Sequence, residues 1–144
     1  MAITIDLLEQ VKRHEGFRSR AYKCSAGKTT VGYGRNLDDV GISREEALEL
    51  LYTDLARSQK AVLSALPWAS SLDTVRLDVL INMALNLGIY GLLKFKKTLR
   101  AVESSEYSVA AAEMLDSRWA AQVGSRAIEL STQMDTGCYT SPLA

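Results

Sequence analysis

A long uninterrupted helical segment in the middle of the chain constrains the fold most. Ser43 followed by Glu46 forms a capping box, and the apolar Ile42 lies just before it. Pro67 ends the segment. Between these limits apolar residues recur along one side of a helix, at Leu48, Leu51, Leu55, Val62 and Leu66. At 1.5 Å per residue, a helix of about 23 residues spans ~35 Å, which is long enough to connect two lobes.

The segments on either side of this helix differ in kind. Residues 3–14 have the period of a short amphipathic helix, and Gly16 follows as a stop signal. Residues 19–37 hold the only convincing β pattern, with alternation around Thr30 and turns at Ser25-Ala26-Gly27 and near Asp38-Asp39. Residues 77–87 are apolar nearly all round, which is typical of a buried central helix.

Further helices are predicted at residues 92–102, 109–121 and 126–134. The fold class is therefore α+β and mostly helical, in a single domain with two lobes. We expect a small β-hairpin lobe over about residues 15–60. The helical lobe would cover about residues 61–144 plus the N-terminal helix 3–14, and the long helix would join the two lobes.

Composition excludes several classes of protein. The chain has 144 residues with seventeen acidic and seventeen basic side chains, which argues against the basic surface of a nucleic-acid-binding protein. No window reaches the roughly 18 consecutive apolar residues of a membrane span. The first twenty residues lack the apolar core of a signal peptide. The two cysteines, with no secretion signal, are expected to be free thiols in a reducing compartment.

Three side chains able to do chemistry converge from different elements. Glu15 lies near a helix end, Cys24 lies in a polar loop and Thr30 lies where the β alternation begins. Loops held by a rigid frame often carry function. These three side chains are therefore candidates for a catalytic site.

The spacing of the three residues carries a resemblance. Glu15, eight residues, Cys24, five residues and Thr30, followed by the GYG of residues 32–34, resemble the catalytic signature of the phage-type (T4-like) lysozymes and endolysins of glycoside hydrolase family 24. The segment VRLDVLINMALNLG at residues 75–88, then Phe95, then DSRWAAQVGSRA at residues 116–127 resemble later parts of that family in the same order. Cys24 departs from the pattern, because most members have aspartate there.

The resemblance implies a lysozyme-like two-lobed fold and a muramidase activity. The chain would be an endolysin that hydrolyses the β-1,4 bond between N-acetylmuramic acid and N-acetylglucosamine in bacterial peptidoglycan during lysis of the phage host. Glu15 would be the general acid, and Thr30 would hold the attacking water. Cys24 would either act as a base for that water, which inverts the anomeric carbon, or attack directly, which retains it. We favour inversion, because the family is regarded as inverting.

The resemblance also implies contacts around the cleft. The positions that contact saccharide in the family are Asn36, Leu85, Asn86, Thr98 and Glu113. Arg126 aligns with an arginine that approaches the catalytic glutamate. Arg35 stands where the family has a histidine paired with an acid of the long helix, and Asp54 aligns with that acid, so an Arg35–Asp54 ion pair is expected.

Partners and alternatives follow from the same residues. We expect a monomer that acts on peptidoglycan glycan strands without cofactor, metal, nucleic acid or stable membrane association. It would accumulate in the host cytoplasm before release to the cell wall. Lys23 and Lys28 are close to Cys24 in sequence and are expected to lower the pKa of its thiol. The alternatives are a virion-associated wall-penetrating lysozyme, a catalytically impaired peptidoglycan-binding module, and a peptidase or amidase that uses Cys24 with His14.

Overall fold

The computed structural model describes residues 2–140 and has the predicted class, α+β and mostly helical. The chain divides into two compact units, and the division falls between Leu50 and Leu51. Residues up to Leu50 form unit 1, and residues from Leu51 onward form unit 2. The lobe limits expected from the sequence, including the place of the N-terminal helix in the helical lobe, stay a prediction.

Unit 1 begins with the helix α1, Ile5–Glu15. The Thr4 hydroxyl caps its start by accepting a hydrogen bond from the Leu7 N–H at 3.2 Å. Gly16 ends the helix with a φ of +70°, and its N–H donates to the Lys12 carbonyl at 2.9 Å. These local signals place the Glu15 side chain at the last position of α1.

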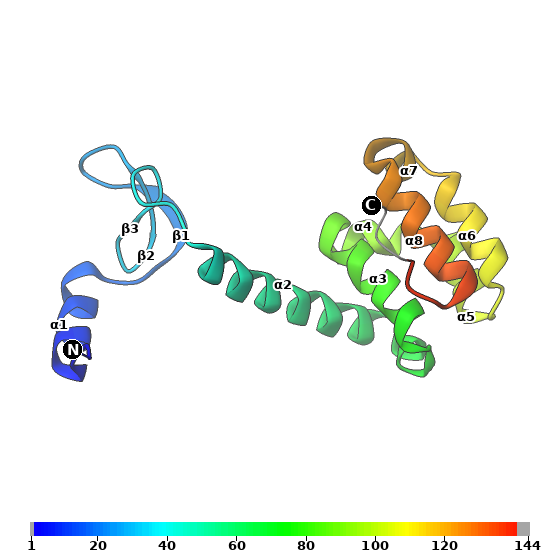
Figure 1. The fold of residues 1–144 in the computed structure, drawn as a ribbon, viewed down its shortest axis with the longest axis horizontal. Helices are drawn as coiled ribbons and strands as arrows, with labels where there is room; N and C mark the ends of the chain where they lie inside the picture. The colour runs from blue at the N-terminus through cyan, green and yellow to red at the C-terminus, as the bar shows by residue number, and fades with distance from the viewer. Residues whose placement is uncertain (1, 141–144) are drawn as a thin grey trace. The chain divides into compact units, whose positions relative to one another are not determined.

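The sheet of unit 1 is antiparallel in the order β1-β2-β3 (Figure 1). Its strands are β1 (Arg18–Lys23), β2 (Thr29–Gly32) and β3 (Arg35–Asn36). The first hairpin turns at Cys24–Gly27, where the Gly27 N–H donates to the Cys24 carbonyl at 2.8 Å and Gly27 has a φ of +77°. The predicted turn at this place is confirmed.

The long helix is confirmed as α2, Arg44–Ala65. The capping box at its start is formed in both directions. The Glu46 N–H donates to the Ser43 hydroxyl at 3.1 Å, and the Ser43 N–H donates to the Glu46 carboxylate at 2.9 Å. Pro67 ends the predicted segment and opens the short 3₁₀ helix η1, Pro67–Ser71.

The expected Arg35–Asp54 ion pair is wrong. The Arg35 guanidinium donates to both oxygens of Glu46, at 2.9 and 2.5 Å, and to the Gly41 carbonyl at 3.0 Å. Asp54 instead accepts from Arg57 at 3.4 Å. The capping box already orients the Glu46 carboxylate at the start of α2, whereas Asp54 lies about 12 Å further along the same helix.

This ion pair gives unit 1 a pH-dependent stability. The hydrogen bond from Arg35 lowers the pKa of Glu46 to about 2. A glutamate in the unfolded chain has a pKa of about 4.3, so the ionised form stabilises the fold above that value and the contribution is lost as the pH falls towards about 2. Glu46→Gln should therefore unfold at lower urea concentration than wild type at pH 7, with a difference that shrinks below pH ~4.3.

Urea unfolding between pH 2 and pH 7 measures this difference. Glu45→Gln is the matched control, because Glu45 lies in the same first turn of α2. A Glu46→Gln effect of constant size over the whole pH range would contradict the prediction.

Unit 2 is helical. Its elements after η1 are α3 (Thr74–Leu87), α4 (Ile89–Leu93), α5 (Lys96–Glu103), α6 (Tyr107–Leu115), α7 (Arg118–Val123) and α8 (Ser125–Thr136). Helix α8 packs against α6, α3 and α7, and α5 packs against α6 (Figure 1).

Helix α3 is the buried central helix that the sequence predicts. Its buried side chains are Val79, Leu80, Ile81, Met83 and Ala84. By length and composition alone, the segment Thr74–Leu93 would suffice to cross a membrane. Gly88, with a φ of +76°, separates α3 from α4 inside that segment, and the buried apolar side chains of α3 belong to the core of unit 2.

Two predicted helices are each split in the structure. The segment 92–102 is divided between the end of α4 and the start of α5, and the segment 109–121 is divided between α6 and α7. Ser117 explains the second break, because its backbone is extended and its hydroxyl caps the start of α7 by accepting from the Ala120 N–H at 3.1 Å. Such local bonds from a serine compete with helix continuation.

Candidate active site

The Glu15 carboxylate lies against the backbone of Gly34. A Cβ placed on Gly34 would stand 2.5 Å from Glu15 Oε2 and 3.0 Å from its carboxyl carbon. Gly34 also has a φ of +82°, which disfavours any residue with a side chain. Gly34 lies between β2 and β3, so the carboxylate is positioned by the turn that joins the two strands.

Gly34→Ala should reduce any activity that uses the Glu15 carboxylate about 100-fold, because the added methyl displaces that carboxylate and a displacement near 1 Å can cost that much. Gly41→Ala is the matched control. Gly41 has a φ of +67° but open space around its Cα, so this variant carries the backbone strain without touching Glu15. Rates on the substrate that the sequence resemblance implies, normalised to folded protein by circular dichroism, measure the effect. Equal losses in both variants would show that strain alone is responsible.

Cys24 and Thr30 are joined through the Lys28 carbonyl. That oxygen accepts from the Cys24 N–H at 2.9 Å and from Thr30 Oγ1 at 3.0 Å. Thr30 is buried, with 4% of its surface exposed, whereas Cys24 is half-buried. The Cys24 backbone and the Thr30 side chain are therefore bonded to the same carbonyl oxygen.

The pKa of the Cys24 thiol is lowered by backbone hydrogen bonds. The main cause is the Lys28 N–H, followed by the Ala26 N–H, and the Thr30 hydroxyl adds to both, while partial burial acts in the opposite direction. The expected cause, the ammonium groups of Lys23 and Lys28, is not the one found. Lys23 Nζ donates to Thr29 Oγ1 at 2.7 Å, and Lys28 Nζ donates to Asp39 at 3.2 Å.

Asn36 lies opposite Thr30 in the sheet. Its amide nitrogen donates to the Asp39 carboxylate at 2.9 Å, and its amide oxygen accepts from the Asp39 N–H at 3.0 Å. Unit 1 thus brings Cys24, Thr30 and Asn36 onto neighbouring parts of one small sheet. Asp38, which the sequence marks only as part of a turn, accepts a hydrogen bond from the Thr29 N–H at 2.8 Å and so lies beside Cys24, Thr30 and Asn36 in the chain's β region.

Unit 2 gathers two of the predicted saccharide contacts in one hollow. Thr98 and Glu113 line a hollow of about 590 Å³ together with Phe95 and Trp119, whose rings meet edge to face at 5.9 Å. Lys94, Lys96, Lys97 and Arg118 also line it, with Asp116. Thr98 is 2% exposed. The hollow therefore combines aromatic surface with charged side chains of both signs.

The other predicted contacts of unit 2 lie elsewhere. Leu85 lines a separate hollow of about 330 Å³, along with Asp54. The Asn86 side-chain oxygen accepts from the Trp119 indole N–H at 2.7 Å, and so orients a ring of the larger hollow. Arg126 donates to the Asn82 side-chain oxygen at 2.5 and 3.1 Å. The approach of Arg126 to Glu15 stays a prediction.

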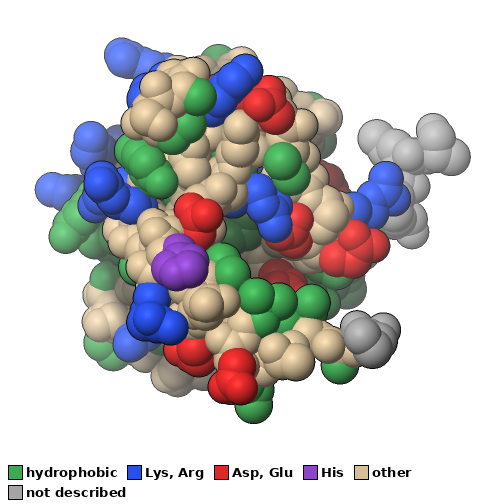
Figure 2. Space-filling view, turned by 90° about the vertical axis from the view of Figure 1, so that its left-hand side faces the viewer, with side chains coloured by type: hydrophobic (Ala, Val, Ile, Leu, Met, Phe, Trp, Pro, Cys, Tyr) green, Lys and Arg blue, Asp and Glu red, His purple; other side chains and the backbone are tan. Residues whose placement is uncertain are grey.

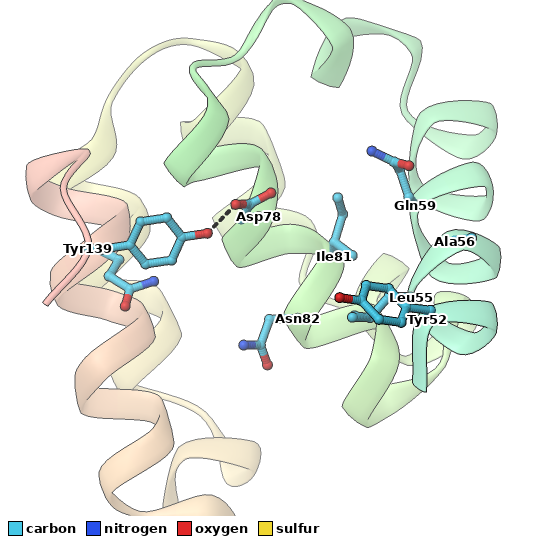
Figure 3. Close-up of a pocket in the computed structure, with 9 residues that line it drawn as sticks. Tyr52, Leu55, Ala56, Gln59, Asp78, Ile81, Asn82 and Tyr139 are labelled. Atoms are coloured by element: carbon cyan, nitrogen blue, oxygen red, sulfur yellow. Dashed lines mark hydrogen bonds between the residues drawn. The ribbon is translucent and has the colours of Figure 1, made fainter. Parts of the chain in front are cut away.

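A further pocket of about 450 Å³ lies in unit 2 and contains none of the predicted site residues (Figure 3). Asn82 and Ile81 line one side of it, and Tyr52 and Gln59 of α2 line another. The Tyr139 hydroxyl donates to the Asp78 carboxylate, and this bond raises the pKa of Tyr139 to about 12.

The peptidase or amidase alternative depends on His14 acting together with Cys24. His14, the only histidine, is exposed and can be seen in Figure 2. Within residues 2–140 it makes no hydrogen bond to Cys24. Both acidic and basic side chains are exposed in the same view. Within the same residues, no three histidine, cysteine, aspartate or glutamate side chains gather as metal ligands.

Comparison with known proteins finds a family match over most of the chain. Residues 12–133 match the sequence profile of the family described as phage lysozyme. The chain is 32% identical over 109 residues to an endolysin of Acyrthosiphon pisum secondary endosymbiont phage 1, covering 73% of this chain and 72% of that protein. It is 27% identical to a probable T4-type lysozyme 1 of Dictyostelium discoideum, covering 90% and 93%. It is also 26% identical to the pre-baseplate central spike protein Gp5 of Enterobacteria phage T4, covering 92% of this chain and 28% of that protein.

Proposed function

Because this chain belongs to the phage lysozyme family, we propose that it is an endolysin that cleaves the β-1,4 bond between N-acetylmuramic acid and N-acetylglucosamine in bacterial peptidoglycan. The observation that carries the proposal is the presence in unit 1 of a carboxylate, a thiol and a hydroxyl at the family's catalytic spacing, with Cys24 and Thr30 bonded to the same Lys28 carbonyl. The similarity to an endolysin supports a role in lysis of a phage host.

Glu15 is the general acid in this proposal. It protonates the departing glycosidic oxygen, while positive charge develops at the anomeric carbon. The close approach of the Glu15 carboxylate to Gly34 supports this role, because it places the carboxylate at the end of α1 beside the turn between β2 and β3.

Cys24 and Thr30 activate the attacking water. The backbone N–H groups of Lys28 and Ala26 favour the thiolate form of Cys24, which can then accept a proton from water. The Thr30 hydroxyl can turn between the Lys28 carbonyl and the sulfur, and its lone pairs remain available to hold the water. The water attacks the face opposite the leaving group, and the anomeric carbon is inverted.

Product analysis tests the reaction. Purified peptidoglycan is digested with the wild-type protein, and the fragments are identified by mass spectrometry together with a reducing-end assay. Reducing ends on N-acetylmuramic acid support the proposal. Reducing ends on N-acetylglucosamine, or free amines without reducing ends, overturn it, the latter in favour of the peptidase or amidase alternative.

Substitutions at Cys24 test the assignment of the thiol. Cys24→Asp keeps an ionised base at the position and should retain most activity, whereas Cys24→Ser offers only a neutral hydroxyl and should lose it. Proton NMR of the first product on a soluble oligosaccharide distinguishes the water-activating thiolate from direct attack. An inverted anomer supports the base, and a retained anomer supports a covalent thioether intermediate.

A second candidate role is wall penetration from the virion. It is favoured by one observation, the match of nearly the whole chain to part of a central spike protein. Mass spectrometry of purified phage particles that encode this chain tests it. Presence in the particle supports the virion role, and presence only in the lysate supports the endolysin. Sedimentation with intact sacculi without any new reducing ends would instead indicate a binding module without catalysis.

A further inference from the structure

The peptide group between Lys28 and Thr29 is held from both of its ends. Its carbonyl accepts from the Cys24 N–H at 2.9 Å and from Thr30 Oγ1 at 3.0 Å. Its N–H donates to the Asp38 carboxylate at 2.8 Å. A trans peptide group is planar, and its C=O and N–H point in opposite directions, so rotation of the group changes all three bonds together.

We propose that Asp38 is a positioning residue, which sets the orientation of the Lys28–Thr29 peptide group and through it the placement of Cys24 and Thr30. This inference rests on the proposed function insofar as it treats those two residues as the water-activating pair. It gives Asp38 a role that a turn residue identified from sequence alone does not have.

The position of Asp38, two residues beyond the end of β3, supports this role. The Leu37 N–H donates to the Thr29 carbonyl at 2.8 Å, but β3 ends at Asn36, so the Thr29 N–H takes a side chain as its acceptor. A carboxylate is a stronger acceptor than a backbone carbonyl. Its bond to the N–H also polarises the peptide group and strengthens the carbonyl on the other side as an acceptor.

Orientation and charge predict opposite effects on the Cys24 thiol. Asp38 is negative, so its removal by itself favours a nearby thiolate. Rotation of the Lys28–Thr29 peptide group would instead disfavour the thiolate. The bond from the Cys24 N–H to the Lys28 carbonyl closes the loop between these residues, and the closed loop brings the Lys28 N–H to the Cys24 sulfur. The direction of the change therefore distinguishes a positioning residue from a bystander charge.

Alkylation of Cys24 by iodoacetamide measures the thiolate directly and does not depend on hydrolysis. The background is Cys138→Ser, which leaves Cys24 as the single thiol. Asp38→Ala should alkylate about tenfold more slowly at pH 7, with the rate profile displaced to higher pH, as expected for a thiol pKa about one unit higher. Asp38→Asn keeps an oxygen acceptor for the Thr29 N–H and should stay within about twofold of the background.

Asp39→Ala is the matched control. It removes the same charge one residue away, from a side chain that contacts Lys28 Nζ and Asn36 but not the Lys28–Thr29 peptide group. It should not slow alkylation. If Asp38→Ala proves unfolded by circular dichroism, Asp38→Ser, whose shorter side chain stays polar, takes its place with the same expected slowing.

Two results would overturn the inference. One is alkylation of the Asp38→Ala or Asp38→Ser protein at or above the background rate, and the other is equal slowing in the Asp39→Ala protein. On peptidoglycan, kcat should fall about tenfold in Asp38→Ala with KM unchanged and recover in Asp38→Asn. If the wild type does not hydrolyse peptidoglycan, the proposed function fails while the alkylation series still decides the role of Asp38.

Discussion

Glu15→Gln should lower the rate of peptidoglycan hydrolysis by roughly 10²- to 10⁴-fold, the usual contribution of a general acid. Glutamine has nearly the shape of glutamate, so the packing against Gly34 is kept and only the proton donor is lost. Binding of the variant to intact sacculi should be unchanged. Initial rates of reducing-end release, with binding measured by sedimentation, test both statements.

Glu9→Gln is the control for this variant. Glu9 lies on the same helix and pairs with Lys12 at 3.2 Å, an exposed pair that contributes little to stability. Its substitution removes the same charge from α1 and should leave the hydrolysis rate unchanged. Retention of more than about a tenth of wild-type activity by Glu15→Gln would show that another group donates the proton.

Arg76→Ala should have the largest effect on stability, a loss of about 3 kcal/mol in the free energy of unfolding of unit 2. The guanidinium donates to the Met134 carbonyl at 2.6 Å and to the Asp135 carbonyl at 2.8 Å, near the C-terminal end of α8. Its side chain is 15% exposed, and its central carbon lies 3.6 Å from the centroid of the Tyr107 ring. Alanine would leave carbonyls at a helix end without donors and remove the stacking partner of the ring.

Thermal unfolding followed by circular dichroism should show a midpoint lowered by about 10 °C for Arg76→Ala. Arg57→Ala is the matched control. Arg57 pairs with Asp54 at 3.4 Å but its side chain is 75% exposed, so its loss should change stability by less than ~0.5 kcal/mol. Similar shifts for both variants would mean that the buried contacts of Arg76 contribute no more than a surface charge.

Features of the fold that depend on neighbours in the chain were predictable. The capping box of Ser43 and Glu46 and the stop at Pro67 defined α2, because both signals act within a few residues. The turn that includes Gly27 and the buried helix that ends before Gly88 were also predicted from neighbouring residues. The split at Ser117 was missed, because a serine can either cap a new helix, as Ser117 does for α7, or lie within one, as Ser131 does in α8, and the choice depends on the backbone around it.

Pairings across the chain were harder to predict. Arg35 was expected to bond Asp54 and bonds Glu46, since the choice among several acids depends on which carboxylate is already oriented. The lysines beside Cys24 were expected to act on its pKa, but both are engaged with other oxygens. Backbone N–H groups act instead, and no sequence pattern reports the direction in which a backbone N–H points.

The sequence by itself determined the class of the fold, the long helix, and the identity and spacing of Glu15, Cys24 and Thr30. Caps, turns and the family signature each depend on residues that are close together in the chain. Only the tertiary structure decided that the Glu15 carboxylate lies against Gly34 and that Asp38 holds the peptide group behind Cys24 and Thr30. These contacts join helix α1, strand β2 and the loops on either side of the strands. They exist only after those elements have packed, since a hydrogen bond or a close approach needs its two groups within about 3 Å whatever their distance in sequence.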